Sequence, residues 1–417
     1  MFSTDRSGAE TWECVAQSNP QAQILQAMKG MITLRSGRNR RKWIYVLLLM
    51  GLLGLSGCGS PSSASVEMSS QTELVKTGSM ELQYAENFAV DYYEDAYKML
   101  TTLPDSKRYL IVPEGQPVPR GLDEDVSILQ EPLQNIYLVA SGVMDMFASL
   151  DAVGQIRFSG QKQENWYIQT AKDAMEAGDM IYAGKYSKPD YELLVSEGCD
   201  LAIENRMITH SPEVVEMLQS FDIPVMIEYS SYEQHPLGKV EWVKFFGALT
   251  GKEAEAEEAF AEQTEILEKV ESGEKTGKTI AFFYVTSNGL IQVRQSTDYI
   301  PKLIELAGGR YIFEDLEDSG SGRSTLNMQV EDFYAGAKDA DILIYNSSID
   351  GGVTTLDELI GKCNILKDFK AVQEGQVYCT TNDMYQQSMA IGYLLQDMHT
   401  VLTDDDTAKL RYLFLLQ

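Results

Sequence analysis

The sequence predicts an α/β protein with two parallel-sheet lobes joined by one long backbone helix, and three observations support this class. Short apolar runs alternate with segments of helical spacing, which is typical of buried parallel strands between helices. This alternation occurs before residue 237 and again after residue 275. The stretch 237–275 is rich in Ala, Glu, Lys, Phe and Leu and favours a helix, although Gly247 and Gly251 interrupt it. Such a helix is a stiff connector, so we expect little closure of the lobes.

The start of the chain has the features of an exported lipoprotein. A cluster of basic residues at 38–42 precedes an apolar segment at 44–55, which is well short of the roughly 20 residues that span a bilayer. Small residues and then Cys58 follow directly. We therefore expect residues 1–57 to be a signal peptide and Cys58 to carry a lipid, the alternative being a short transmembrane anchor.

Residues 58–79 are predicted to be the lipidated cysteine and a polar tether, because this segment is rich in Ser and has too little apolar surface to pack. The lipid would hold the protein at the cell membrane, on its extracytoplasmic face, with no other membrane contact. The formal net charge is −28, and it becomes about −32 when the basic residues 1–57 are removed. So acidic a surface repels phosphate backbones and argues against a nucleic-acid partner.

About 340 residues after the tether are too many for one ordinary core, which supports two lobes. We expect the first lobe over residues 80–236 and the second over residues 276–417. In the first lobe, apolar runs predict strands at 135–140, 199–203 and 223–227, with helices at 143–150, 191–195 and 213–220. In the second lobe, strands are expected at 279–285, 341–345 and 376–379, and a helix at 299–307.

Cysteine and histidine usage argues against an intrinsic metal or cofactor. Apart from Cys58, the mature chain has Cys199, Cys363 and Cys379, an odd number without a CxxC motif. We expect three buried reduced thiols, although Cys363 and Cys379 could pair. The three histidines of the chain are not spaced as metal ligands, so a His-rich site for free Zn²⁺ or Mn²⁺ is not expected.

From 135 to 401 the chain resembles the substrate-binding lipoproteins of ABC importers for iron complexes and corrinoids. The connector segment 241–253 is similar to a segment of that family's backbone helix. The other matching segments, in the order and spacing of the family, are 136–150, 156–160, 188–194, 199–203, 303–309, 330–333, 339–344 and 369–378. The segment 80–129 resembles only a subgroup of these lipoproteins.

The resemblance implies a monomeric receptor, not an enzyme, with an ABC permease dimer and its ATPase subunits as partners. The cargo it implies is a small-molecule metal complex: a ferric siderophore or other iron chelate, haem, or a corrinoid such as cobalamin. In the family, one glutamate at the start of a helix in each lobe pairs with arginines of the permease. The matching residues here are Glu192 and Glu331. A helix N-terminus favours an exposed carboxylate, but both could equally be ordinary helix-start acids.

Ligands of two-lobed α/β proteins bind where the carboxyl ends of the strands face each other. Loops at these ends contain aromatic, Arg and amide side chains, which suit a large, flat, partly anionic ligand. The ligand-binding residues predicted on this basis are Ser141, Met144, Trp166, Tyr167, Tyr182, Lys185, Asn205, Arg206, Tyr229, Tyr232, Asn288, Gln292, Arg294, Asn346, Met384 and Tyr385.

Two other functions remain open at the level of sequence. An exported α/β hydrolase is one, although no GxSxG, HExxH or phosphate-binding glycine motif occurs in a suitable strand-to-helix context. A surface receptor that acts without transport is the other. Release of the ligand unchanged would separate a receptor from an enzyme.

Overall fold

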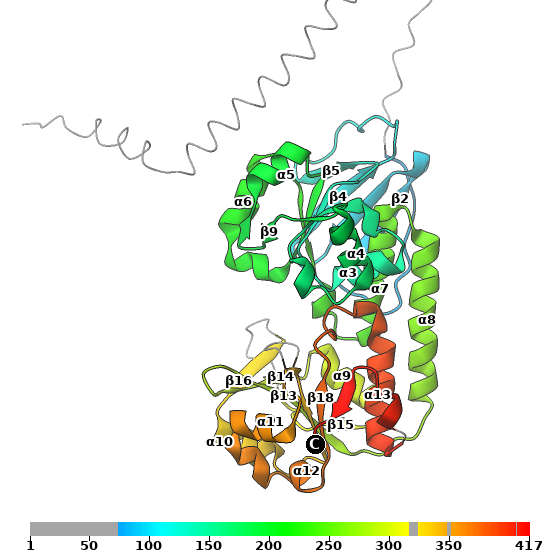
Figure 1. Ribbon diagram of the computed structural model, residues 1–417. Coiled ribbons are helices and arrows are strands. Elements are labelled where there is room, and N and C mark those ends of the chain that lie inside the picture. The colour runs from blue at the N-terminus through cyan, green and yellow to red at the C-terminus, as the bar shows by residue number, and fades with distance from the viewer. Residues whose placement is uncertain (1–73, 317–323, 348–351, 406) are drawn as a thin grey trace, which may run out of the picture. The chain divides into compact units, whose positions relative to one another are not determined.

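The computed structural model describes residues 74–316, 324–347, 352–405 and 407–417, and it shows an α/β protein with two lobes (Figure 1). The predicted signal peptide and Cys58 lie outside the described residues. Residues 76–79, which we expected at the end of the tether, instead form the strand β1 (Lys76–Ser79). Among the described residues, no helix has both the length and the apolar character that crossing a membrane requires.

The N-terminal lobe begins with a five-stranded sheet that the sequence patterns had not assigned. Its order is β1-β2-β3-β4-β5, antiparallel except for the parallel pair β4 and β5. The strands after β1 are β2 (Phe88–Tyr93), β3 (Lys98–Thr102), β4 (Lys107–Val112) and β5 (Val126–Gln130). One face packs into the main core through residues such as Phe88 and Leu100, while Tyr97 and Leu110 form a separate small cluster.

The second sheet of this lobe is the parallel sheet that the sequence predicted. Its order is β12-β11-β6-β7-β8, and all its pairings are parallel. The strands are β6 (Ile136–Leu138), β7 (Ile156–Ser159), β8 (Ile181–Tyr182), β11 (Leu201–Asn205) and β12 (Val225–Glu228). The helices are α3 (Val143–Ser149), α4 (Gln169–Ala177), α5 (Tyr191–Glu197) and α6 (Pro212–Ser220).

The range predicted as one connecting helix, 237–275, contains two helices. The first is α7 (Pro236–Thr250), whose residues are buried from Pro236 to Leu249. It ends at Gly251, which adopts a left-handed conformation with φ of 72°. The second, α8 (Glu253–Glu271), is the long helix that runs between the lobes (Figure 1). Gly247 permits their close packing, because a Cβ there would lie 2.6 Å from the Cβ of Ala256.

The C-terminal lobe contains a mixed sheet of order β16-β14-β13-β17-β18-β19, with β15 paired to β13. The central pairs, β13 with β17 and β17 with β18, are parallel. The strands are β13 (Thr279–Val285), β14 (Ile291–Arg294), β15 (Arg310–Tyr311), β16 (Thr325–Met328), β17 (Ile342–Tyr345), β18 (Val377–Thr380) and β19 (Leu413–Leu415). The helices are α9 (Tyr299–Leu306), α10 (Val330–Ala337), α11 (Leu356–Lys362), α12 (Lys370–Gln373) and α13 (Ile391–Thr403).

The three cysteines of the described residues are free thiols, so Cys363 and Cys379 do not pair. Cys363 and Cys379 are buried, and Cys199 is partly buried. Burial raises the pKa of the Cys199 thiol to about 12, which keeps it protonated and unreactive at neutral pH.

Candidate functional site

A cavity of about 240 Å³ opens where three parallel strands of the N-terminal lobe end. Residues following β6, β11 and β12 supply most of its wall, α7 supplies one residue, and the C-terminal lobe supplies Tyr385. The lining residues are Ala140, Ser141, Gly142, Asn205, Arg206, Met207, Glu228, Ser231, Tyr232, Lys239 and Tyr385. The carboxyl ends of parallel strands are the usual place for a ligand in such folds, so this cavity is the candidate site.

Five predicted residues meet in this cavity: Ser141, Asn205, Arg206, Tyr232 and Tyr385. The guanidinium of Arg206 lies 4.5 Å from the centre of the Tyr232 ring, which places a cation against an aromatic face. The Asn205 side chain accepts a hydrogen bond of 2.9 Å from the Met207 backbone N–H and fixes the turn after β11. The wall therefore combines positive charge, aromatic surface and amide groups.

Two further predicted residues, Arg294 and Asn346, contact the site through Tyr385. Both donate hydrogen bonds to its hydroxyl, and the bond from Asn346 Nδ2 measures 2.6 Å. The Arg294 guanidinium is buried and lies 3.3 Å from the carboxylate of Asp298. Arg294 and Asn346 are therefore positioning residues that orient Tyr385 at the cavity.

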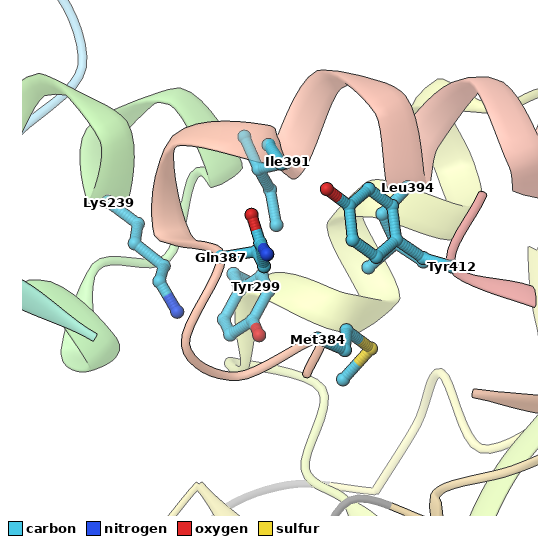
Figure 2. A pocket seen from close by; sticks show the side chains of 8 residues that line it. Lys239, Tyr299, Met384, Gln387, Ile391, Leu394 and Tyr412 are labelled. Carbon is cyan, nitrogen blue, oxygen red and sulfur yellow. The ribbon is translucent and has the colours of Figure 1, made fainter. Parts of the chain in front are cut away.

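Lys239, which the sequence reasoning missed, reaches the cavity from α7. Its side chain is only 5% exposed, and its ammonium lies 4.8 Å from the centre of the Tyr299 ring. Burial lowers the pKa of this lysine. Figure 2 shows Lys239 extending toward Tyr299 and Gln387, beside a second cavity of about 10 Å³, which holds no more than a water molecule. Met384, also predicted, lines this small cavity.

Glu228 is a second lining residue that the sequence reasoning missed, although it stands at the end of β12, one residue beyond the predicted strand. One of its carboxyl oxygens accepts hydrogen bonds of 2.9 Å from the Ser230 backbone N–H and 2.5 Å from the Ser230 hydroxyl. Burial raises the pKa of Glu228. The cavity wall thus contains two basic side chains and one engaged carboxyl group, which favours an anionic ligand.

A loop of the C-terminal lobe, between β18 and α13, is fastened to the N-terminal lobe. The Gln386 amide accepts a hydrogen bond from the Tyr167 backbone N–H and donates one to the Asn165 carbonyl, both of 2.8 Å. The Met389 backbone N–H donates to Asp145 on α3 at 2.7 Å. Burial raises the pKa of Asp145 to about 6. These contacts set the position of Tyr385, which lies in the same loop.

The structure corrects the predicted roles of Met144, Trp166 and Tyr229. Their side chains belong to the hydrophobic core, and those of Met144 and Trp166 are 0% exposed. The indole N–H of Trp166 donates a hydrogen bond of 3.0 Å to the Ser159 hydroxyl, which satisfies its polar atom inside the core. Aromatic character in a loop was the sequence signal here, and it does not separate a core side chain from a ligand-binding one.

The remaining predicted ligand-binding residues lie outside the lining of the cavity. They are Tyr167, Tyr182, Lys185, Asn288 and Gln292. Tyr167, Tyr182, Lys185 and Asn288 are exposed. The Gln292 amide donates a hydrogen bond of 3.2 Å to Asn327 on the neighbouring strand β16.

Glu192 and Glu331 are each the second residue of a helix, one in each lobe. Each is exposed and lies in the first turn of its helix, α5 and α10 respectively. The N-cap of α5 is Asp190, whose side chain accepts a hydrogen bond of 3.1 Å from the Leu193 backbone N–H. Because Asp190 caps the helix, the Glu192 carboxylate is not needed for capping.

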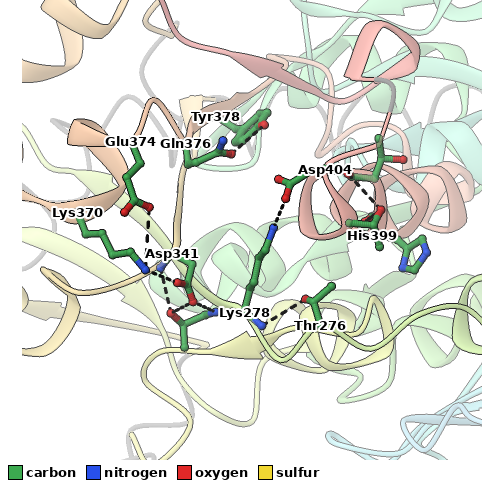
Figure 3. A network of polar contacts seen from close by, with 12 residues as sticks. Thr276, Lys278, Asp341, Lys370, Glu374, Gln376, Tyr378, His399 and Asp404 are labelled. Carbon is green, nitrogen blue, oxygen red and sulfur yellow. Dashed lines mark hydrogen bonds and ion pairs between the residues drawn. The ribbon is translucent and has the colours of Figure 1, made fainter.

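A polar network at the amino ends of strands in the C-terminal sheet has a structural role (Figure 3). Asp341, just before β17, accepts hydrogen bonds from the N–H and the hydroxyl of Thr279 at 2.7 and 2.8 Å. The ammonium of Lys370 lies 2.6 Å from the same carboxylate. Thr279 and Asp341 lie at the amino ends of β13 and β17, so the network stabilises the end of the sheet away from the candidate site.

In the described parts of the chain, no cluster of three or more Asp, Glu, His or Cys side chains is arranged to hold a metal ion.

Comparisons of sequence find relatives that are named as lipoproteins. No family model matches the chain. An uncharacterized lipoprotein of Methanocaldococcus jannaschii is 24% identical over 397 residues, which cover 86% of this chain and 92% of the relative. A second uncharacterized lipoprotein of the same organism is 23% identical over 371 residues, or 83% of this chain and 90% of the relative.

Comparisons of structure find solute-binding proteins. A possible iron-binding, periplasmic solute-binding protein of Staphylococcus epidermidis has a TM-score of 0.51 at 17% identity, covering 64% of this chain and 98% of that one. A periplasmic heme-binding protein of Vibrio cholerae has a TM-score of 0.52 at 14% identity, with coverage of 64% and 98%. The Fe³⁺-hydroxamate transport protein of Saccharomonospora viridis has a TM-score of 0.51 at 17% identity, with coverage of 65% and 93%. At such identities the likeness shows a shared fold.

Proposed function

We propose that this chain, which has the two-lobed fold of periplasmic solute-binding proteins, is a lipid-anchored extracytoplasmic receptor that delivers a solute to an ABC-importer permease. The observation that carries the proposal is the cavity at the carboxyl ends of β6, β11 and β12, bounded on one side by Tyr385 of the other lobe. The lipoprotein relatives support export and anchoring through Cys58. In this proposal the cavity holds its ligand and releases it unchanged.

The cargo we propose is an iron complex, either a ferric siderophore or haem, or a corrinoid. Arg206 stacked on Tyr232 offers a flat cationic and aromatic surface, and Tyr385 of the C-terminal lobe lines the same cavity. Such a surface suits a large planar or chelate ligand with negative charge. Solved proteins of the same fold are named for iron, heme and hydroxamate complexes, which supports the same class.

Titration of the protein with ferric siderophores, haem and cobalamin tests the cargo. We expect saturable binding of one of these at one-to-one stoichiometry, and we expect Arg206→Ala to weaken it at least tenfold, since a charge-assisted contact contributes roughly 1.5–3 kcal/mol. Calorimetry is the appropriate readout, because Trp166 and Trp242 are both fully buried and neither lines the cavity.

Lys185→Ala is the matched control, because Lys185 is a basic residue of the same lobe outside the cavity. It should bind the cargo as the unmodified protein does. Recovery of the ligand unchanged supports a receptor, whereas a chemically altered ligand would favour the exported hydrolase. Equal affinity in Arg206→Ala and Lys185→Ala would remove the cavity from consideration as the site.

Docking to the permease is tested by the double variant Glu192→Ala with Glu331→Ala. We expect uptake of the cargo by cells to fall several-fold or more while its affinity in calorimetry stays unchanged, because rim charges guide docking and do not line the cavity. The control is Glu213→Ala with Asp357→Ala, which removes exposed first-turn acids from α6 and α11. If both double variants import equally well, Glu192 and Glu331 do not dock the permease, and a receptor without transport becomes the better proposal.

A further inference from the structure

Lys239 is an unusual residue for its position in the fold. It belongs to α7, a helix buried along almost its whole length, yet it is one of the residues that line the candidate cavity. Within the described chain it forms no ion pair, and its contact is with the face of the Tyr299 ring. A buried ammonium without an anionic partner is destabilising unless something compensates it.

Glu228 and Asp298, two carboxylates that raise the pKa of Lys239, are already engaged by other groups. Glu228 accepts hydrogen bonds from the backbone and hydroxyl of Ser230. Asp298 accepts from Arg294 at 3.3 Å and from the Ile300 backbone N–H at 2.9 Å. Both influence the pKa of Lys239 through space, but neither forms an ion pair with it. Among the described residues, Lys239 therefore has no direct anionic partner, and a ligand in the cavity could supply one.

We propose that Lys239 receives a carboxylate of the bound cargo and makes the site selective for carboxylate-bearing complexes over neutral ones. Arg206 also lines the cavity and would share the anionic group or hold a second one. An ion pair formed by a buried ammonium is stronger than one at the surface, and it discriminates against a ligand that lacks the charge. This inference rests on the proposed function, because it assigns a chemical class to the cargo of that site.

The competing explanation is that Lys239 only balances the buried charges of Glu228 and Asp298. In that case its replacement would lower stability without changing which ligands bind. The two explanations differ in a property that can be measured on the unmodified protein, namely whether a small carboxylate approaches the Lys239 ammonium.

The first measurement follows the side-chain NMR signal of Lys239 in the full chain labelled with ¹³C-lysine, assigned with Lys239→Arg. Citrate is the probe, and its trimethyl ester is the neutral control. We expect citrate to shift the Lys239 signal saturably and the ester to leave it in place. An unchanged Lys239 signal at saturating citrate would overturn the proposal.

The second measurement compares haemin with haemin dimethyl ester, which have the same macrocycle but differ in carboxylate charge. We expect Lys239→Met to weaken haemin binding roughly 10- to 100-fold and to change the affinity for the ester little, whereas Lys239→Arg retains the preference. An equal loss for haemin and ester would overturn the proposal and favour the structural role.

The two proposals fail in different ways. If citrate shifts the Lys239 signal but no iron complex or corrinoid binds, the proposed function fails while the carboxylate site stands. If an iron complex binds, Lys239 gives no shift, and Lys239→Met keeps the preference between haemin and its ester, the receptor stands and the role of Lys239 is refuted.

Discussion

Replacement of Glu241 by alanine is expected to detach the N-terminal sheet from α7 and to lower the free energy of unfolding by about 3–5 kcal/mol. The Glu241 side chain is fully buried and accepts hydrogen bonds from three consecutive backbone N–H groups. They come from Gln83, Tyr84 and Ala85, at distances between 2.8 and 3.1 Å. Without the carboxylate, these N–H groups lose their partners, and each buried donor left unpaired costs roughly 1–3 kcal/mol.

Two neighbouring groups make the loss of Glu241 more severe. The buried ammonium of Lys244 lies 3.6 Å from its carboxylate and would lose this partner. Glu233, the second carboxylate that holds the segment before β2, accepts from the backbone N–H groups of Glu86 and Asn87 and from the indole of Trp242. It cannot replace Glu241, because its oxygens already have these three donors.

Denaturant unfolding gives the change in stability, and hydrogen exchange at residues 83–85 reports the detachment. Glu257→Ala is the matched control, because Glu257 also pairs with Lys244, at 3.0 Å, but is 63% exposed. We expect this control to change stability by less than about 1 kcal/mol, as is usual for exposed ion pairs. If Glu241→Ala costs no more than Glu257→Ala, the buried carboxylate does not anchor the sheet.

The parallel strands could be predicted from sequence because they are buried on both faces and therefore read as continuous apolar runs. The strand predicted at 279–285 coincides with β13, and the run 341–345 differs from β17 by one residue. The sheet β1–β5 was not assigned, since its attachment depends on contacts such as that between Ala85 and Glu241, 156 residues apart. Periodicity within a segment contains no signal for such a long-range bond.

The site was predicted only in part, because some of its residues are brought together by contacts between distant parts of the sequence. The rule that ligands bind at the carboxyl ends of strands identified Ser141, Asn205 and Arg206, which lie at or shortly after the ends of β6 and β11. Lys239 was missed because it lies within a helix, where a lysine is usually on a solvated face. In the folded protein α7 is buried almost along its whole length, so Lys239 has no solvated face and instead lines the cavity.

Glu204, in β11, should give the protein a stability that falls as pH rises from about 4.5 to about 8. The side chain is completely buried beside Tyr137 and Tyr191, and neither carboxyl oxygen has a hydrogen-bond partner among the described residues. Burial raises the pKa of Glu204 from 4.5 to about 8. The folded protein therefore keeps this carboxyl group protonated over a range in which the unfolded chain ionises it.

The sign of the effect follows from proton binding. Between these pH values the folded state holds one proton more than the unfolded state, so stability is full below pH 4.5 and is lost as pH rises through the folded pKa. A shift of this size corresponds to an upper limit of about 4–5 kcal/mol across the range. Other titrating groups contribute their own slopes, which cancel when a variant is compared with the unmodified protein.

Glu204→Gln and Glu204→Leu both remove the titrating group and differ in polarity, so together they separate titration from packing. We expect both variants to show the same shallower decline of the free energy of unfolding between pH 5 and pH 8, measured by denaturant titration at about half-unit pH steps. Glu204→Leu should also be the more stable of the two, because its side chain has no polar atom to leave unpaired in the core. Parallel pH profiles for both variants and the unmodified protein would mean that Glu204 is solvated or paired in solution, and that the carboxyl end of β11 is more open than the structure shows.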